Sequence, residues 1–517
     1  MPHSRFPASL IIFAVLLSGC GSNSDDDKDG GTGTAAPVRG SLVQNPPSKL
    51  ATYSPTELLA TLGGGDLGQL LLQLAFNPKC TIDVHQLQYN TVGAGGEPTT
   101  ASGALMVPSG SDPACQGGRP IVLYAHGTSP DRNYNIANLN GSNNSEALLL
   151  AAVFAAQGYI VVAPNYAGYD SSTLAYHPYL NADQQSKDMI DALAAARSAL
   201  PTSAAPATTD GGKLFITGYS QGGYVAMATQ RALQASGQTV TASGPMSGPY
   251  ALAAFSDAVF YGQVSLSAPL SFTLLVSGYQ HAYGNIYSAP TDIFEAKYAS
   301  GIGSLLPSTD SGNLSAQGKL PSDQLFSSTP PDPAYASITP PTTPANLAPV
   351  FAAGFGADNL IINSYRLAYL QDAAAHPDGG FPTTTDGLPA AAPANAFRQA
   401  LKLNDLRNWT PTAPTLLCAG SEDPTVFYLN TQLMQGYWAA NTPTAPVTIV
   451  DIDSSPTGGD PYGDLKNGFE AAKQLAAATA VVQGASDGGA ADVAKNYHAG
   501  LVAPFCLAAV DAFFKGF

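Results

Sequence analysis

One short segment, residues 213–236, limits the possible folds of this chain more than any other. Four residues of β character, Leu214 to Thr217, run directly into Gly218-Tyr219-Ser220-Gln221-Gly222-Gly223, and an alanine-rich stretch of helical character follows. A strand that turns this sharply into a helix lifts the central serine above the strand ends, and the small neighbouring residues relieve the crowding. The segment predicts Ser220 as a nucleophile, with a purely structural glycine-rich turn as the alternative.

Strand-like and helix-like patterns alternate on both sides of this segment. Continuous apolar runs over residues 120–125 and 159–163 predict strands that are buried on both faces. An earlier hairpin over residues 80–107 predicts an antiparallel edge, and a leucine pattern over residues 58–74 predicts helix interrupted by glycines. The sequence therefore predicts an α/β fold with a mostly parallel sheet and helices on both faces. Further strands are expected at 213–217, 240–246, 415–419 and 447–450, and further helices at 146–157, 183–200, 221–236, 426–440 and 469–482.

The alternation stops over residues 248–411, where proline- and alanine-rich stretches separate short helix-like pieces near 292–299 and 359–375. We expect this region to be a cap or lid inserted into a core formed by residues 51–247 and 412–517. Its many aromatic residues form either the cap's own core or a hydrophobic substrate groove. They are Phe255, Phe260, Tyr261, Phe272, Tyr279, Tyr283, Tyr287, Phe294 and Tyr298.

The first residues have the form of an export signal. The apolar run at residues 10–17 is too short to span a bilayer, and Leu17-Ser18-Gly19-Cys20 resembles the lipobox of bacterial lipoproteins. That resemblance implies a signal peptide over residues 1–20, acylation of Cys20, and a lipid anchor in the outer membrane or cell surface, or release from it. An ordinary cleaved signal is the alternative. Residues 21–50, rich in Ser, Asp, Gly, Thr and Pro, are expected to be a flexible tether.

Export would leave four cysteines in an oxidising compartment, which predicts two disulfides. We favour Cys80–Cys115, because these residues flank the predicted hairpin, and then Cys418–Cys506 by elimination. Buried free thiols are the alternative. The cysteines lack the close Cys and His spacing of a zinc site, so we expect no metal.

The chain is acidic, with 37 Asp and Glu against 21 Lys and Arg and a formal net charge of −16. A negative field of this size repels polyanions, so we expect no nucleic-acid partner. Its 517 residues are enough for one large domain with a sizeable insertion.

A nucleophilic serine requires a base, an acid to orient that base, and donors for the developing oxyanion. Asp423 follows the predicted strand 415–419, with Glu422 as its neighbouring competitor. Asp451 and Asp453 are weaker candidates, expected to be solvated loop carboxylates. Imidazole accepts and returns a proton near neutral pH, and His498 is the one histidine after these acids.

Two backbone N–H groups are expected to form the oxyanion hole. One belongs to Gln221, the residue after the serine, and the other to the loop His126-Gly127-Thr128-Ser129 that follows the strand 120–125. We favour Thr128, with Gly127 and Ser129 as alternatives.

The Gly-Tyr-Ser-Gln-Gly-Gly turn, the Ala163–Gly168 run and the cap resemble the secretory lipases and esterases of the α/β-hydrolase superfamily. Asn165 departs from the acidic residue that many relatives carry. The resemblance implies hydrolysis of carboxylic esters, most of them hydrophobic, through an acyl-enzyme on Ser220, with Asp423 and His498 completing the triad and no cofactor. The alternatives are an exported serine aminopeptidase, anchored by Asp292, Glu295, Asp358 or Asp372, and an inactive surface binding protein on the same scaffold.

Overall fold

The computed structural model describes residues 37–63, 77–140, 145–203 and 208–517. The chain from Pro37 onward forms one compact unit. The predicted signal peptide with Cys20, the first part of the tether and the leucine pattern over residues 67–74 lie outside the described residues.

A nine-stranded sheet forms the centre of this unit, in the order β1-β2-β3-β5-β4-β6-β7-β8-β9. Strands β4 to β9 run parallel to one another, whereas β1, β2 and β3 pair antiparallel at one edge. The mostly parallel sheet with an antiparallel edge is confirmed. The strands are β1 Ser48–Tyr53, β2 Thr81–Val92, β3 Pro98–Ser109, β4 Gly117–Ala125, β5 Ile160–Pro164, β6 Thr208–Tyr219, β7 Ala242–Met246, β8 Thr415–Ala419 and β9 Val447–Asp451.

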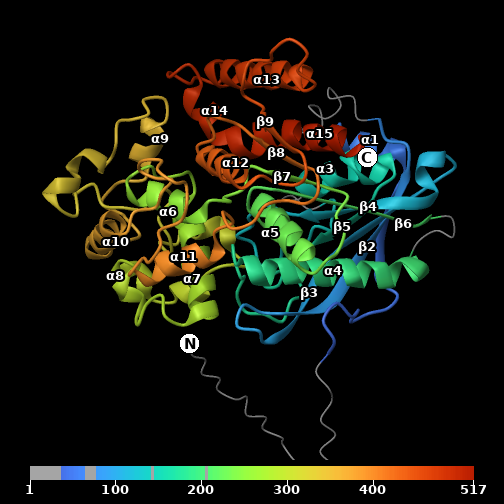
Figure 1. Cartoon of the computed structure of the whole chain (residues 1–517), viewed down its shortest axis with the longest axis horizontal. Coiled ribbons are helices and arrows are strands. Elements are labelled where there is room, and N and C mark those ends of the chain that lie inside the picture. Colours follow the sequence, from blue (N-terminus) through green and yellow to red (C-terminus); the bar gives the residue numbers. More distant parts are fainter. Residues whose placement is uncertain (1–36, 64–76, 141–144, 204–207) are drawn as a thin grey trace, which may run out of the picture. The chain divides into compact units, whose positions relative to one another are not determined.

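Helices cover both faces of the sheet, because β5, β7 and β8 are buried along their whole length and would otherwise expose both faces to water. Helices α4 and α5 lie on one face, and α3 and α15 on the other (Figure 1). The helices of the core are α1 Pro55–Leu62, α3 Ser145–Val153, α4 Ala182–Ser203, α5 Gln221–Ala235, α12 Leu429–Asn441, α13 Gly463–Val482, α14 Ala490–Asn496 and α15 Ala503–Phe514.

The tether was predicted to extend to residue 50, and this prediction is wrong for its last part. Ser48–Tyr53 forms the edge strand β1 against β2, and the Arg39 guanidinium pairs with Asp191 on α4 at 3.0 Å. Strand β1 is largely exposed and carries polar residues, so its sequence shows no apolar alternation. Backbone pairing with β2, which the sequence pattern does not reveal, makes this segment a strand.

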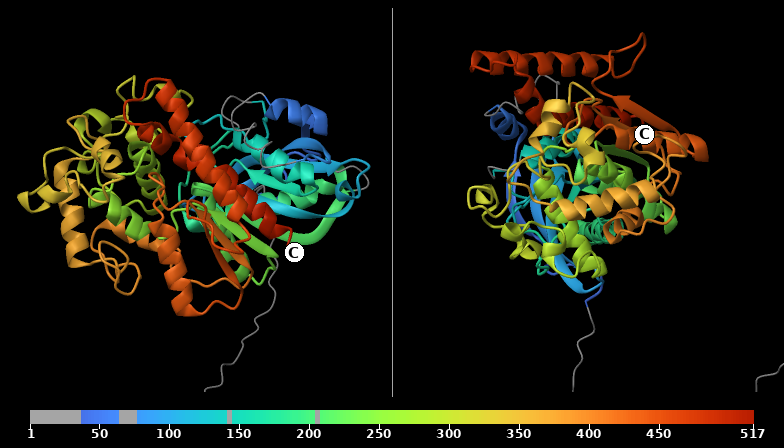
Figure 2. Two further views of the ribbon diagram at one scale, coloured as in Figure 1. Left: turned by 90° about the horizontal axis from the view of Figure 1, so that it is seen from above. Right: turned by 90° about the vertical axis from the view of Figure 1, so that its left-hand side faces the viewer.

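Between β7 and β8 the chain leaves the sheet and forms the insertion, residues 247–414. It gathers at one end of the sheet, as the views in Figures 1 and 2 agree. Short helices and long irregular connections alternate in it, and the helix expected at 292–299 is reduced to α8. Its helices are α6 Leu252–Phe260, α7 Ala268–Tyr283, α8 Ala296–Ala299, α9 Ala348–Ala353, α10 Asn363–Ala375 and α11 Ala396–Asn404.

Two disulfides connect distant parts of the core. Cys80 is bonded to Cys115, which ties the start of β2 to the segment before β4. Cys418 on β8 is bonded to Cys506 on α15. These are the two pairings favoured from the sequence, and disulfides of this kind are typical of exported proteins.

The helical stretch from Ala490 to Phe514 is long and apolar enough to span a membrane, the one such stretch among the described residues. It is 72% buried over its most apolar window, so its apolar side chains are already covered by the rest of the protein. Burial of this extent is typical of a core helix.

Candidate active site

Ser220 stands at the sharp turn between β6 and α5. Its backbone has φ 61° and ψ −122°, a strained conformation for a non-glycine residue, and its N–H donates to the Met246 carbonyl at 3.0 Å. A Cβ atom on Gly222 would overlap the carbonyl oxygen of Ala125, and one on Gly218 would overlap that of Gly222. The two glycines are therefore required for β4, β6 and α5 to approach each other closely, which raises the serine above the strand ends.

His498 lies on a turn of π-helix, Tyr497–Val502, just before α15. Its Nδ1 is 2.6 Å from Asp423 Oδ2, and the residue is 8% exposed. Because a carboxylate can only accept, the neutral imidazole carries its proton on Nδ1 and presents the Nε2 lone pair. Nε2 is buried and has no hydrogen-bond partner among the described residues. It is therefore free to accept a proton.

Backbone donors fix the Asp423 carboxylate. Its Oδ1 accepts the N–H groups of Thr425 and Val426 at 2.9 and 3.0 Å, which leaves Oδ2 for His498. The competing carboxylate of Glu422 is on an exposed residue. Asp423 is thus the acid that the structure brings to His498.

Asp451 and Asp453 are not the solvated loop carboxylates that the sequence suggested. Asp451 accepts the N–H groups of Ser421 and Asp453 at 3.1 Å each, and burial raises its pKa. Asp453, with a side chain only 3% exposed, pairs with Lys473 and accepts the Tyr497 hydroxyl. These two partners of Asp453 could not be predicted from the sequence. Lys473 lies on α13 and Tyr497 begins the π-helical turn, so both are distant from Asp453 along the chain.

Tyr219 and Tyr497 hold the histidine turn in place. The Tyr219 hydroxyl donates to the His498 carbonyl, and the Tyr497 hydroxyl accepts the N–H of Glu422 at 3.2 Å. These tyrosines connect the turn at Ser220, the loop that carries Asp423 and the π-helical turn that carries His498. This role could not be predicted, since both residues stand beside the predicted triad without a motif of their own.

The two predicted oxyanion donors border the same cavity as Ser220 and His498. The Thr128 hydroxyl is hydrogen-bonded to the Tyr179 hydroxyl at 2.9 Å, and the Gln221 amide nitrogen starts α5. Of the two alternatives, Gly127 also borders the cavity, whereas Ser129 does not. The Ser129 carbonyl accepts the Tyr169 hydroxyl, and the Ser129 hydroxyl accepts the N–H of Asp131.

His177, which the sequence left without a role, supports the Gln221 side chain. Its Nδ1 donates to the Ala167 carbonyl at 3.0 Å, so its Nε2 must accept, and the Gln221 side-chain amide donates to it at 2.7 Å. Burial lowers the pKa of His177 to about 3, which keeps the ring neutral. Nothing in its sequence context distinguishes it from an ordinary loop histidine.

The cavity has a volume of about 480 Å³ and is mainly apolar. Of the nine aromatic residues singled out in the insertion, Phe255, Phe260 and Phe272 border it, while the other six pack within the insertion or against its core. Six of the nine thus contribute to packing and three line the cavity, and a substrate groove at these three stays a prediction. Other apolar side chains on the wall are Leu149, Leu252, Val259, Leu270, Leu275, Leu325, Phe397, Val426 and Leu507.

Among the described residues, Glu146 is the one Asp, Glu, Lys or Arg on the cavity wall, and no group of three or more His, Cys, Asp or Glu side chains is arranged to hold a metal ion. Burial raises the pKa of Glu146 to about 7. Glu146 is therefore partly ionised near neutral pH and fully ionised only above it.

Comparison with known proteins agrees with this architecture. Residues 147–260, which contain the turn at Ser220, match the prolyl oligopeptidase family. The rice cell wall degrading esterase LipA from Xanthomonas oryzae superposes with a TM-score of 0.61 at 28% identity, over 83% of this chain and 95% of LipA. The chain has the α/β-hydrolase fold.

A putative hydrolase from Legionella pneumophila superposes with a TM-score of 0.58 at 19% identity, over 79% of this chain and 91% of its own. At that identity it supports the fold alone. No protein of curated function matches the sequence. The likeness to LipA and to the prolyl oligopeptidase family supports a serine hydrolase of the esterase type.

Proposed function

We propose that this α/β-hydrolase is an exported serine carboxylesterase or lipase, with Ser220, His498 and Asp423 as its catalytic triad. One observation carries the proposal. His498 is oriented by Asp423 at 2.6 Å, its Nε2 has no partner among the described residues, and the residue lines the same apolar cavity as the strained Ser220. An oriented base and a half-buried nucleophile on the wall of one cavity form the arrangement that acyl transfer requires.

In the proposed reaction, the Ser220 hydroxyl attacks the ester carbonyl while His498 Nε2 takes its proton. Asp423 stabilises the imidazolium that forms, and the N–H groups of Thr128 and Gln221 bind the oxyanion. Collapse of the tetrahedral intermediate expels the alcohol, which receives the proton from His498. A water molecule, activated by the same imidazole, then releases the acid from the acyl-enzyme. These steps use protein groups and water alone.

The apolar wall supports esters with a hydrophobic acyl or alcohol part. A cavity of about 480 Å³ is large enough for a small or medium-sized organic group. LipA is described as degrading rice cell wall, so esters of plant polymers are candidates for this chain as well as simple lipids. A panel of p-nitrophenyl esters of increasing chain length, assayed with protein lacking residues 1–20, would identify the preferred acyl group.

Substitution of the nucleophile tests the proposal. Ser220→Ala should lower kcat on p-nitrophenyl butyrate by about 10⁶-fold and abolish labelling by a fluorophosphonate. Ser243→Ala is the matched control, because Ser243 is a buried serine on the neighbouring strand β7 whose hydroxyl has no partner among the described residues. Normal turnover by Ser220→Ala would refute the assignment.

The aminopeptidase alternative keeps some support from the prolyl oligopeptidase match. Its expected anchors are engaged elsewhere. Asp292 accepts backbone N–H groups, Glu295 accepts the Asn359 amide, Asp358 pairs with Lys297, and Asp372 pairs with Arg398; none of these acids borders the cavity. Hydrolysis of aminoacyl p-nitroanilides in preference to p-nitrophenyl butyrate would favour the peptidase, and failure of fluorophosphonate labelling would favour the inactive binding protein.

Export is proposed on the lipobox-like segment and the two disulfides. A lipid anchor on Cys20 would attach the enzyme to the outer membrane or cell surface. Cys20→Ser should then move the activity from the membrane fraction to the soluble fraction of the expressing cells. Unchanged partitioning would contradict the anchor without affecting the catalytic assignment.

A further inference from the structure

The proposed mechanism leaves the one Asp or Glu side chain that the described residues place on the cavity wall without a role. Glu146, in the first turn of α3, borders the cavity that contains Ser220 and His498. Its carboxylate accepts the Tyr124 hydroxyl at 2.7 Å and the N–H of Gly127 at 3.1 and 3.2 Å. An acid on an apolar wall costs free energy unless its contacts compensate, so its contact with the loop 126–128 requires an explanation.

The other side of this loop is also held. The Gly127 carbonyl oxygen lies 2.6 Å from His126 Nδ1. In a trans peptide the carbonyl and the following N–H point in opposite directions. The N–H of Thr128 is therefore directed away from the His126 ring. Glu146 holds the peptide before Gly127. His126 packs against the peptide after it, although its neutral ring, whose Nε2 faces the Asn165 carbonyl at 3.0 Å, can donate to only one of the two carbonyls.

We propose that Glu146 is a positioning residue for the oxyanion hole, whose carboxylate holds the Gly127 N–H so that the Thr128 N–H faces the substrate carbonyl. The proposal rests on the proposed function, because it concerns the same site. Glu146 acts through the loop and not on the reacting atoms. A charge-assisted hydrogen bond is about twice as strong as a neutral one, which suits a carboxylate to this task.

The ionisation of Glu146 gives this role a pH signature. The titratable groups facing it are Tyr124, Tyr134, Tyr166 and Tyr219, whose pKa values burial raises well above the ordinary value, so they stay uncharged. None of the described Lys or Arg side chains pairs with it. Burial raises the pKa of Glu146 to about 7. As the pH falls through this value, the carboxylate becomes a neutral acid and its hold on Gly127 weakens.

The test compares Glu146→Gln with the unaltered enzyme on p-nitrophenyl butyrate. Glutamine keeps the shape and an acceptor but loses the charge, so kcat at pH 8 should fall about 10-fold with KM within about twofold, less than the 10²- to 10³-fold cost of deleting an oxyanion donor. On the acid side of the pH profile, log(kcat/KM) of the unaltered enzyme should fall with a slope steeper than one. A slope of one would mean that a single protonation abolishes activity, whereas the proposal adds the protonation of Glu146. In Glu146→Gln this acid limb should have a slope of one.

Asp191→Asn is the matched control. Asp191 is also a buried carboxylate with a pKa raised by burial, but it pairs with Arg39 and Thr91 and does not border the cavity. It should lower the melting temperature without changing kcat or the slope of the acid limb.

Each outcome decides the matter. Glu146→Gln with unaltered kcat and an unaltered acid limb would overturn the inference while the proposed function stands. Absence of Ser220-dependent turnover in the unaltered protein would overturn both. A Glu146→Leu variant should lose more activity than Glu146→Gln. If it does not fold, the isosteric variant and the pH profile of the unaltered enzyme still give the answer.

Discussion

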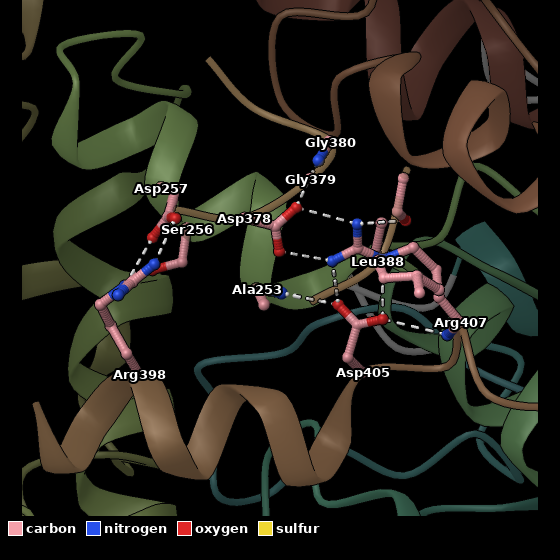
Figure 3. Close-up of polar contacts among 12 residues, drawn as sticks. Ala253, Ser256, Asp257, Asp378, Gly379, Gly380, Leu388, Arg398, Asp405 and Arg407 are labelled. Atoms are coloured by element: carbon pink, nitrogen blue, oxygen red, sulfur yellow. Dashed lines mark hydrogen bonds and ion pairs between the residues drawn. The ribbon is translucent and has the colours of Figure 1, made fainter. Parts of the chain in front are cut away.

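The sheet and the insertion are stabilised by different kinds of interaction. In the sheet, strands such as β5 and β8 are buried along their whole length and satisfy their backbone groups by pairing with neighbours. In the insertion, where the chain is mostly irregular, buried arginines connect its segments (Figure 3). Arg398 of α11 pairs with Asp257 of α6 at 2.8 Å, and Arg407 pairs with Asp378 at 2.7 Å and Asp405 at 2.9 Å.

A third arginine, Arg366, has no carboxylate partner. It donates to the Phe260 carbonyl, the Ile338 carbonyl and the Thr339 hydroxyl, and its guanidinium lies 4.5 Å from the centre of the Phe326 ring. Burial lowers its pKa to about 10. The guanidinium fork offers five N–H donors in one plane, which suits it to collecting carbonyls and carboxylates from several loops. Where regular pairing is scarce, buried arginines thus take over the task of joining segments.

The largest effect should come from removing the more buried of the two ion-paired arginines, Arg407. Arg407→Met leaves the carboxylates of Asp378 and Asp405 buried without their cation and should cost about 3–5 kcal/mol. Because Asp405 also accepts the N–H of Ala253 at the start of α6, α6 and α11 should lose hydrogen-exchange protection before β6 and β7.

Since α6 carries residues of the cavity wall, KM for hydrophobic esters should rise in the same variant. Uniform loss of protection across sheet and insertion would show instead that the two regions unfold as one unit, and the contrast between them would fail.

Removing the disulfide at the antiparallel edge should lower the free energy of unfolding by less than Arg407→Met does. It should also leave the cavity unchanged. Cys80→Ser with Cys115→Ser opens a loop of sequence separation 35 and should cost about 2–4 kcal/mol. The melting temperature of the double variant should fall, while kcat and KM at 25 °C stay unchanged, because neither cysteine borders the cavity. A change in KM comparable to that of Arg407→Met would show that this edge also shapes the cavity, and the contrast between the two regions would fail.

The smallest loss of stability is expected from breaking an exposed arginine–aspartate ion pair. Arg197 and Asp210 lie 3.0 Å apart with side chains 40% and 25% exposed. Arg197→Met should change the free energy of unfolding by less than about 1 kcal/mol, since solvent screens the pair. Chemical denaturation measures the difference from Arg407→Met directly. Equal losses in the two variants would mean that burial does not govern these ion pairs.

The sequence was sufficient for those features that follow local rules. The elbow at Ser220 could be predicted because an apolar strand, a glycine-rich turn and an alanine-rich helix follow one another without a gap. Asp423 and His498 were selected by their order along the chain, and the structure brings them to 2.6 Å. Their catalytic roles stay predictions.

The remaining features depend on contacts that chain order does not encode. Nothing in the sequence around Arg407 separates it from exposed Arg197, because burial is decided by the folding of the whole insertion. Glu146 appeared only as the start of a predicted helix, although it contacts the loop of Gly127. Strand β1 was not predicted, because its polar residues face water and its partner strand lies some 30 residues further along the chain.

The Cys418–Cys506 disulfide determines what a cut in the backbone does to the proposed active site. The residues between these cysteines form a covalent ring that includes both Asp423 and His498. Within that ring α13 presents Leu475, Val481 and Val482 to solvent at 66%, 48% and 88% exposure, which makes its end a natural place for cleavage. A cut there separates the acid from the histidine along the backbone but not as molecules, because β8 and α15 remain joined through sulfur. A nicked enzyme would therefore survive as a single two-chain particle, recognisable by a gel band that splits only under reducing conditions.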